Sequence, residues 1–595
     1  MTEKLFNDFP PVSTQEWEDQ INKDLKGADY EKRLVWKTPD GLRVRPYYRE
    51  EDLKGISHLD TLPGQKPYLR GTKKDNNWLI RQGFLVGDSL QEVNDRILAA
   101  LDRGVESVGL RFDLSRQYDE EDMKVLLAGI FLPAVEISFA GVSCEKPGVF
   151  YAFLEYLRQS GTNPLQVRAR FEFDPLGDAF FSGKLPDQKV LQVLKELVQA
   201  CDPYPQVRVV SVSGCRMHDR GAGVVQELAF SMAMGEEYIS LLTGMGIPLP
   251  LAVRSIHFHM GIGSHYFLEI AKFRAARVFW SQVADSAISV HATASFWNQT
   301  AYDMYVNLLR GTTQAMSAAI AGIDSMEILP YDRVIRDGTD QSFRLARNIQ
   351  IILKEEAHFD RVIDPAAGSY YVENLTDSIL KESRKIYDEL IQKGGFSTVQ
   401  GSQWIRDAID SSRQRRLQNL SSRREILVGL NQYPDLEGKA PEGLSTAGDE
   451  KWLRAAANFE KMRLRTEQAG EEVPVVFLLT FGNLAMCRAR AQFSANFFGV
   501  AGFRIIDNNC FASVDEGVQA ARSSGAHIVV ACSSDEEYET AVPQMSRSLG
   551  DGILLVVAGD PPCKDVLIAQ GISHFISVRS NVLETLLQYQ NELGL

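Results

Sequence analysis

The chain has 595 residues, more than one hydrophobic core usually supports, so at least two domains are expected. Its composition, 44% hydrophobic and 24% charged, is that of a globular protein. A formal net charge of -14 repels phosphate backbones and anionic lipid, which argues against nucleic-acid or membrane partners because the sequence shows no local basic patch.

Residues 1–45 are expected to form an N-terminal arm for subunit contact. The first residues, MTEKLFNDFPP, lack a basic region followed by an apolar run, and no segment is long enough to span a bilayer, so we expect a cytoplasmic protein. Ser13 is a predicted N-cap and Glu16 stands at the capping-box position, which predicts a polar helix through Leu25. Such a helix packs either on its own chain or around a partner, and the spacing leaves both open.

Residues 46–385 alternate short apolar runs with helix-length amphipathic sequence, which predicts an α/β domain. The predicted strands are LIRQGF, VESVGLRF, AVEISFAG, VRARFEF, VRVVSVSG, VRSIHFHMGI, SVHATASF and SMEILP. Eight strand-helix units are the number found in a closed (β/α)₈ TIM barrel, and we interpret the strands as near-continuously apolar. An active site in this fold belongs at the C-terminal ends of the strands.

Residues 386–470 are helical and charged, with Gly and Pro interruptions, and are interpreted as a linker. A second alternation fills residues 471–595, with strands VPVVFLLTF, FRIIDNN, HIVVACSS, GILLVVAG and HFISV. Five such units predict a small, doubly wound, flavodoxin-like domain, which places ligands at strand C-terminal ends beside helix N-termini. Seven scattered cysteines without a C-x-x-C pair indicate reduced thiols.

Four stretches resemble the methylmalonyl-CoA mutase family of adenosylcobalamin-dependent isomerases. They are the arm beginning FPPVSTQEWEDQINKDLKGADY, then GIGSHYFLEIAKFRAARVFW, DPAAGSYYVENLTD and REILVGLNQY. The resemblance extends over nearly the whole chain and implies a barrel followed by a cobalamin-binding-type domain. It does not by itself imply activity, since fold and function separate.

The cofactor loop of that family is D-x-H-x-x-G, in which a neutral imidazole ligates cobalt and the aspartate orients it. Here Leu484, Met486 and Ala489 stand at the three functional positions. A thioether is a weak ligand and leucine cannot orient one by hydrogen bonding. Met486 as an unusual cobalt ligand is the alternative; we interpret it as core filler.

Two further cofactor-binding positions of the family are altered. The S-x-L turn that holds the nucleotide tail appears as Cys532, Ser533 and Ser534, followed by the acidic residues 535–537. The Gly-Gly pair after the fourth strand appears as Ala558 and Gly559. Acidic side chains have the wrong sign for a phosphodiester. The resemblance therefore implies no cofactor in this chain.

The barrel also departs from the family. The family's Tyr-His pair after the fifth strand falls on Cys215 and Arg216, and its T-x-R-x-Y pattern on the first strand gives Leu79, Arg81 and Gly83. His218 is either a displaced substitute or, as we prefer, a loop histidine. Cys215 as a nucleophile is a further alternative, because Arg216 is expected to lower the pKa of its thiol.

A different class of function rests on His257 and His259, which form an H-x-H on a predicted strand. Such a pair binds metal in some barrel hydrolases, which makes a metal-dependent hydrolase the competing hypothesis. Two histidines fall short of a complete ligand set, so we expect packing inside the barrel and no metal site.

The resemblance implies a small, non-catalytic subunit, without catalytic residues, of a heterodimer with a larger related chain that holds adenosylcobalamin. The complex is expected to interconvert methylmalonyl-CoA and succinyl-CoA by a radical mechanism, and this chain to stabilise its partner. An active acyl-CoA mutase with an altered cofactor site remains the alternative.

Overall fold

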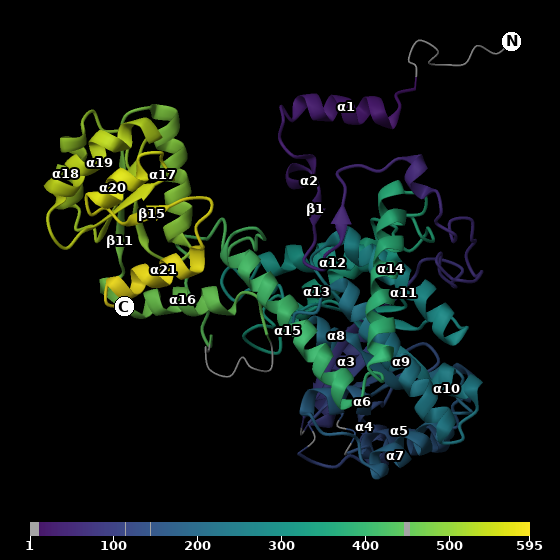
Figure 1. Cartoon of the computed structure of the whole chain (residues 1–595). Coiled ribbons are helices and arrows are strands. Elements are labelled where there is room, and N and C mark those ends of the chain that lie inside the picture. The colour runs from purple at the N-terminus through teal and green to yellow at the C-terminus, as the bar shows by residue number, and fades with distance from the viewer. Residues whose placement is uncertain (1–10, 88, 114, 143, 145, 445–452) are drawn as a thin grey trace.

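The computed structural model describes residues 11–87, 89–113, 115–142, 144, 146–444 and 453–595. An N-terminal arm leads into a barrel, and two long helical segments connect the barrel with a second α/β domain (Figure 1). No helix in the described part of the chain is both long and apolar enough to cross a membrane.

Eight parallel strands close the barrel in the order β10-β3-β4-β5-β6-β7-β8-β9. Their bounds are β3 Leu79–Val86, β4 Ser107–Phe112, β5 Glu136–Ala140, β6 Arg168–Phe173, β7 Val207–Ser213, β8 Ile256–Ile262, β9 Val290–Ala294 and β10 Ser325–Glu327. Each coincides with a predicted run, so the predicted barrel is confirmed. Closure occurs where Ser325 pairs with Leu79.

Helices surround this barrel. They are α3 Leu90–Leu101, α4 Glu120–Leu126, α5 Gly148–Ser160, α6 Pro175–Ser182, α7 Gln188–Ala200, α8 Gly214–His218, α9 Val224–Gly244, α10 Leu249–Ser255, α11 Tyr266–Ala284, α12 Val306–Ala321, α13 Asp340–Glu355 and α14 Tyr370–Gln392. The helix α14 continues through residue 385, where the sequence placed a domain boundary.

The inner face of the barrel is polar, so the expectation of near-continuously apolar strands was wrong. Arg81 donates to Ser107 Oγ at 2.9 Å and to Glu136 Oε1 at 2.8 Å, and Glu136 Oε2 accepts from Arg170 at 2.9 Å. Burial alone would raise the pKa of Glu136, but Arg170 and Arg81 outweigh it and hold this pKa far below its usual range. Apolar residues face the helices, while charged residues, paired with one another, fill the interior.

A second buried ion network connects two of the family-like stretches. Arg274 of α11 is fully buried and donates to Asp364 at 3.0 and 3.1 Å and to Glu373 at 2.9 Å. Arg70 donates to the same carboxylates at 2.8 and 2.7 Å. These contacts join α11, the start of α14 and the loop before the barrel into one unit.

The arm carries α1 Thr14–Asp24, α2 Tyr30–Arg33, β1 Trp36–Lys37, β2 Arg43–Val44 and the single 3₁₀ turn η1 Glu50–Leu53. The predicted capping box is confirmed, because Ser13 Oγ accepts from Glu16 N at 3.2 Å while Ser13 N donates to Glu16 Oε2 at 2.8 Å. No residue of α1 is buried. The helix stands apart from the barrel helices at the end of the arm (Figure 1).

The C-terminal domain is a five-stranded parallel sheet in the order β12-β11-β13-β14-β15. Its strands are β11 Val475–Thr480, β12 Arg504–Ile506, β13 Ile528–Cys532, β14 Leu554–Ala558 and β15 His574–Ile576. Its helices are α17 Leu484–Gly499, α18 Val514–Ser523, α19 Asp535–Leu549, α20 Lys564–Ala569 and α21 Val582–Glu592, and α15 Val399–Ser421 and α16 Ala457–Gln468 precede it. This strand order confirms the predicted flavodoxin-like topology.

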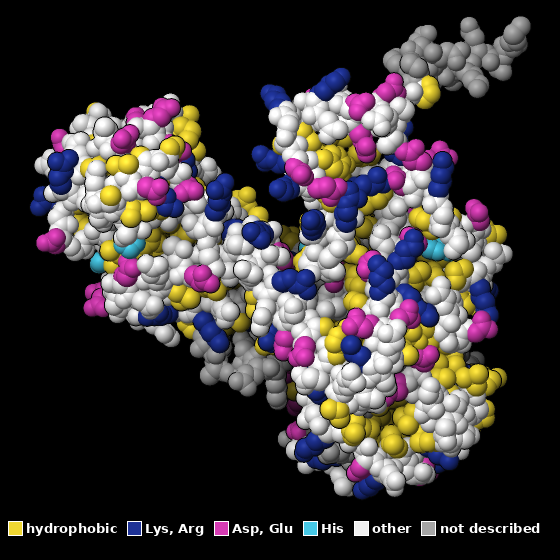
Figure 2. Space-filling view, viewed as in Figure 1, with side chains coloured by type: hydrophobic (Ala, Val, Ile, Leu, Met, Phe, Trp, Pro, Cys, Tyr) yellow, Lys and Arg dark blue, Asp and Glu magenta, His cyan; other side chains and the backbone are white. Residues whose placement is uncertain are grey.

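Lysine and arginine side chains are interspersed with aspartate and glutamate on the face shown in Figure 2. That view agrees with the absence of a basic run in the sequence.

Candidate functional site

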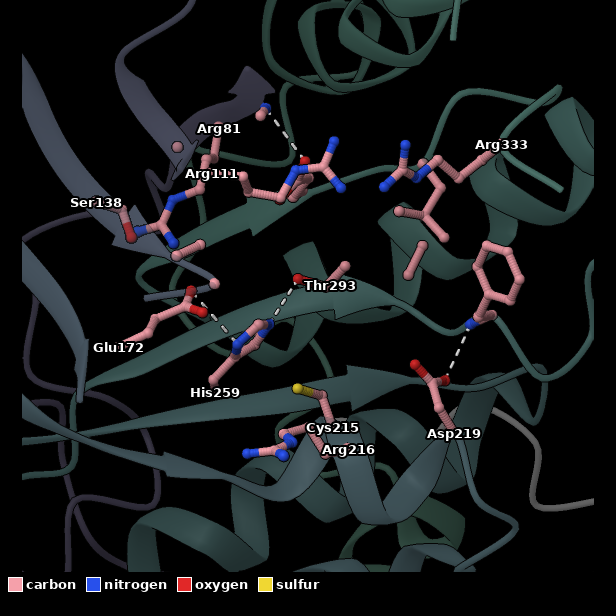
Figure 3. A pocket seen from close by; sticks show the side chains of 18 of the residues that line it. Arg81, Arg111, Ser138, Glu172, Cys215, Arg216, Asp219, His259, Thr293 and Arg333 are labelled. Atoms are coloured by element: carbon pink, nitrogen blue, oxygen red, sulfur yellow. Dashed lines mark hydrogen bonds and ion pairs between the residues drawn. The ribbon is translucent and has the colours of Figure 1, made fainter. Parts of the chain in front are cut away.

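A cavity of about 510 Å³ lies at the C-terminal end of the barrel, where the fold places active sites. All eight barrel strands, or the loops that follow them, contribute residues to the cavity lining, among them Arg81, Ser138, Glu172, Cys215 and His259 (Figure 3). The family-matched positions of the barrel therefore do converge on one pocket.

His259 and Glu172 form the floor of this cavity (Figure 3). His259 Nε2 lies 2.8 Å from Thr293 Oγ1, and its Nδ1 lies 3.6 Å from Glu172 Oε1. Burial, together with nearby Arg81, lowers the pKa of His259 to about 3, and burial raises the pKa of Glu172 to about 7. The imidazole is therefore neutral near pH 7, and the carboxyl titrates there.

His257 lies one layer deeper, where its Nε2 is 3.0 Å from the Phe171 carbonyl oxygen. Both histidines thus bond to neighbours within the barrel. Within the described ranges, no group of three or more His, Cys, Asp or Glu side chains is arranged to hold a metal ion.

Gly83 is accompanied by Glu327 from the neighbouring strand β10. Glu327 Oε1 accepts from Gly83 N at 3.1 Å, and a Cβ added at Gly83 would lie 2.7 Å from the same oxygen. The Glu327 carboxylate therefore takes the space into which a side chain at position 83 would extend. A tyrosine at this position would require the Glu327 carboxylate to move.

Cys215 is the second residue of the short helix α8, and its environment contradicts the expectation that Arg216 lowers the pKa of its thiol. Burial and the neighbouring Asp219 raise the pKa of the Cys215 thiol well above its usual value. Arg216 is directed to Asp178 at 2.8 Å and lies over the Phe181 ring, 4.2 Å from its centroid. Because acidic neighbours and burial outweigh the guanidinium, Cys215 is a poor nucleophile.

His218 does not line the cavity. Its ring is buried against α9, with Nδ1 2.9 Å from Glu227 Oε2, and Lys272 donates to the same carboxylate oxygen at 2.7 Å. It belongs to α8 instead of a loop, and it does not replace the family histidine in this pocket.

The family's cobalt-ligand position is at the surface of the C-terminal domain. Leu484 is 65% exposed and Met486 38% exposed in the first turn of α17, which Asn483 caps by accepting from Met486 N at 3.1 Å. The interpretation of Met486 as core filler was therefore wrong. Ala489 is also exposed, one turn further along the same helix.

Glu537 fills the end of the sheet beside this turn. Its carboxylate accepts from Ser534 Oγ at 3.0 Å, Ser534 N at 3.3 Å and Asn483 N at 3.4 Å, and also from Ser533 Oγ. Burial alone would raise the pKa of Glu537, but these hydrogen bonds outweigh it and lower this pKa. A Cβ at Gly482 would overlap this carboxylate. The backbone donors of Ser534 and Asn483 are thus taken by a carboxylate of the chain itself.

An ion pair lies at the C-terminal ends of strands β13 and β14. Arg490 of α17 donates to Asp535 of α19 at 2.9 Å, and a Cβ at Gly559 would lie 3.2 Å from both groups. The buried strand ends Cys532 and Ala558 lie below, so Arg490 and Asp535 span the positions matched to the family's nucleotide-tail site.

Sequence reasoning missed Glu172, Glu327 and Arg490, and it placed Glu537 at the cofactor site only as one of three acidic residues, without its hydrogen bonds. The signal for Glu172 was the alternation of charged residues along strands β5 and β6. Glu136, Arg170 and Glu172 lie at alternate positions, which share the inner face of the barrel. The signal for Glu537 was its position three residues after Ser534, which is a capping box.

Comparison with known proteins decides the family. The family model described as methylmalonyl-CoA mutase matches residues 37–122 and 118–474. The chain belongs to the methylmalonyl-CoA mutase family. A methylmalonyl-CoA mutase small subunit from Porphyromonas gingivalis is 42% identical over all of this chain and 99% of that one. The small subunit from Streptomyces virginiae is 30% identical over 92% and 91% of the two chains.

A methylmalonyl-CoA mutase from Escherichia coli is 30% identical over 71% of this chain and 64% of that one. The family is adenosylcobalamin-dependent, and the residues of this mutase-family chain do not fit that cofactor. No imidazole stands at positions 484–489, and Glu537 and the Arg490–Asp535 pair take up the donors and space at the neighbouring strand ends.

Proposed function

We propose that this chain is the non-catalytic small subunit of a heterodimeric methylmalonyl-CoA mutase. The large subunit of the complex holds adenosylcobalamin and interconverts methylmalonyl-CoA and succinyl-CoA in the cytoplasm. This chain binds the folded large subunit and stabilises it by mass action. Residues 1–45, 46–385, 386–470 and 471–595 act as arm, mutase-like barrel, linker and cobalamin-binding-like domain.

The observation that carries the proposal is the state of the C-terminal pocket. A carboxylate from Glu537 takes the backbone donors of Ser534 and Asn483, and an exposed Met486 stands where the family has its cobalt ligand. An anionic nucleotide tail would have to displace that carboxylate and would then face its negative charge. An active mutase with an altered cofactor site is disfavoured for the same reason.

The barrel supports the proposal independently. Glu327 occupies the space above Gly83, and Cys215 carries a thiol that burial keeps protonated. Among the described residues no tyrosine lines the cavity, and Arg216, which lines it at the position of the family's histidine, is directed to Asp178. A substrate radical formed here would lack both the aromatic cover and the carbonyl contact that the family supplies.

The arm supports a role in assembly. The helix α1 buries none of its residues, and Trp17 is 50% exposed although its ring lies 5.8 Å from that of Tyr47. A helix that gains little from packing on its own chain is stabilised when its apolar face meets another surface. The second copy of the fold in the large subunit offers such a surface.

The decisive experiment is to purify this chain alone, the large subunit alone and the pair. Adenosylcobalamin is added to each, and the bound-cofactor absorbance and mutase turnover are recorded. We expect no cofactor with this chain alone, and both cofactor and turnover with the pair. Stoichiometric cofactor on this chain alone would contradict the proposal.

Met486→His tests the cofactor pocket directly. We expect the single variant to bind no cobalamin, because Glu537 and the Arg490–Asp535 pair remain in place. The matched comparison is a series of variants in which Leu484→Asp, Ala489→Gly and Glu537→Ala are added one at a time to Met486→His. A cobalamin spectrum already present with Met486→His alone would show that the pocket has been misinterpreted.

Deletion of residues 1–30 tests the arm. We expect weaker co-purification with the large subunit and an unchanged thermal unfolding midpoint of the isolated chain, since α1 has no buried residue. The exposed-tryptophan variant Trp17→Ala is a milder version of the same test. Undiminished assembly by the truncated chain would exclude a role for the arm.

A further inference from the structure

The barrel cavity is large although the family's tyrosine and histidine are replaced at its matched positions. Its walls include Gly109, Ala140, Leu329, Pro330 and Phe343, which present mostly carbon to about 510 Å³ of space. Volumes of this order accommodate small organic ligands. An apolar cavity of this size inside an otherwise close-packed domain requires an explanation.

Two arginines meet at the mouth of the cavity. Arg111 from β4 and Arg333 from the loop after β10 direct their guanidinium groups toward each other (Figure 3). Asp337 Oδ1 accepts from both, at 3.5 Å from Arg111 and more closely from Arg333, and the Asp337 side chain is 56% exposed. Burial and the proximity of Arg111 lower the pKa of Arg333 to about 10, although Glu327 and Asp332 act in the opposite direction.

The opposite end of the cavity is closed and close to neutral. The layer of Arg81, Glu136 and Arg170 below it is internally hydrogen-bonded and closes the barrel on that side. His259 is neutral and Glu172 only partly ionised near pH 7. Ser138 lines the cavity with a fully buried hydroxyl that has no hydrogen-bond partner in the described part of the chain. Such an orphaned donor is usually satisfied by a guest molecule or water.

We propose that this cavity binds a small organic anion. Its apolar body lies between the strand ends, and its carboxylate or phosphate group is held by Arg111 and Arg333 in place of Asp337. Guanidinium groups bind both kinds of anion through paired hydrogen bonds, and two facing arginines that share one exposed carboxylate have unused donors. This site goes beyond the proposed subunit role, because an inactive barrel that binds an anion could report its concentration to the assembled enzyme.

The test is titration calorimetry on the full-length chain with three probes of six carbons each: hexanoate, hexyl phosphate and the uncharged hexanamide. We expect at least one of the two anions to bind saturably and about tenfold more tightly than hexanamide, the worth of one charge-assisted hydrogen-bond pair. Preference for hexanoate or for hexyl phosphate identifies the anionic group. Neither anion binding more tightly than hexanamide at concentrations up to about 10 mM would overturn the proposal.

Variants locate the bound anion. Arg111→Gln and Arg333→Gln should each weaken anion binding about tenfold and leave hexanamide binding unchanged. Asp337→Asn should tighten anion binding several-fold, because it removes the competing carboxylate at an exposed position, a gain that general damage to the fold would not produce. Arg579→Gln, at a side chain that is 86% exposed in the other domain, is the matched control. Equal affinity in all four variants would place the anion elsewhere and refute this site.

Discussion

Replacing Arg274 with methionine should destabilise the protein more than most single substitutions. The side chain is fully buried and makes four hydrogen bonds: two to Asp364, one to Glu373 at 2.9 Å and one to Thr376 at 2.8 Å. Methionine retains much of the apolar stem but none of the donors. Two buried carboxylates would then share the hydrogen bonds of Arg70.

The expected loss is about 3–5 kcal/mol, the typical cost of removing one partner from a buried ion pair. The loss should depend on pH. Burial alone would raise the pKa of Asp364 and of Glu373, but Arg274 outweighs it and lowers both. Stability from such a lowered pKa is present above the unfolded-state pKa near 4 and disappears as pH falls through the folded-state pKa. The difference between variant and wild type should therefore be largest at neutral pH and shrink below about pH 4.

Urea unfolding followed by far-ultraviolet circular dichroism measures this effect. With a denaturant slope of about 3 kcal/mol/M, the midpoint of the barrel transition should fall by about 1–1.7 M. The control is Arg158→Met, which removes an exposed pair with Glu155 and should change stability by less than about 1 kcal/mol. Similar midpoints for the two variants would refute the reasoning, because burial of the network would then carry no energetic weight.

Two further predictions follow from the barrel cavity. Gly83→Tyr should lower the thermal unfolding midpoint by several degrees, because its Cβ would lie 2.7 Å from Glu327 Oε1. Adding Glu327→Ala to this variant should restore part of the lost stability. No recovery in the double variant would exclude this clash as the cause. Glu172→Gln should be more stable than wild type at pH 8 by about 1–3 kcal/mol and no more stable at pH 5. The reason is that burial raises the pKa of Glu172 to about 7, so ionisation of the wild-type carboxyl above that pH destabilises the folded state. The exposed Glu121→Gln serves as the comparison in urea titrations at both pH values, and an equal effect in the two variants would contradict this assignment.

The strand positions, the barrel closure and the flavodoxin-like strand order were predictable because strand-helix alternation is a local pattern that repeats along the chain. The polar interior was not predicted, since strands such as VRARFEF were judged by overall hydrophobicity instead of by alternate positions, which place Arg170 and Glu172 on one face. Met486 was misjudged because helical spacing does not say whether a neighbouring element covers the helix. The Cys215 pKa depends on Asp219 and on burial, which a single adjacent Arg216 could not reveal.

The self-contained pocket around Glu537 also bears on the proposal that this chain holds no cofactor. A carboxylate attached to the same chain competes for the donors of that pocket at an effective concentration of about millimolar or higher. A cofactor in solution competes only at its bulk concentration. The Glu537 carboxylate sits on the donors of Ser534 and Asn483 without having to diffuse there. A cobalt ligand placed at position 486 would therefore add little cofactor affinity as long as this tethered competitor remained.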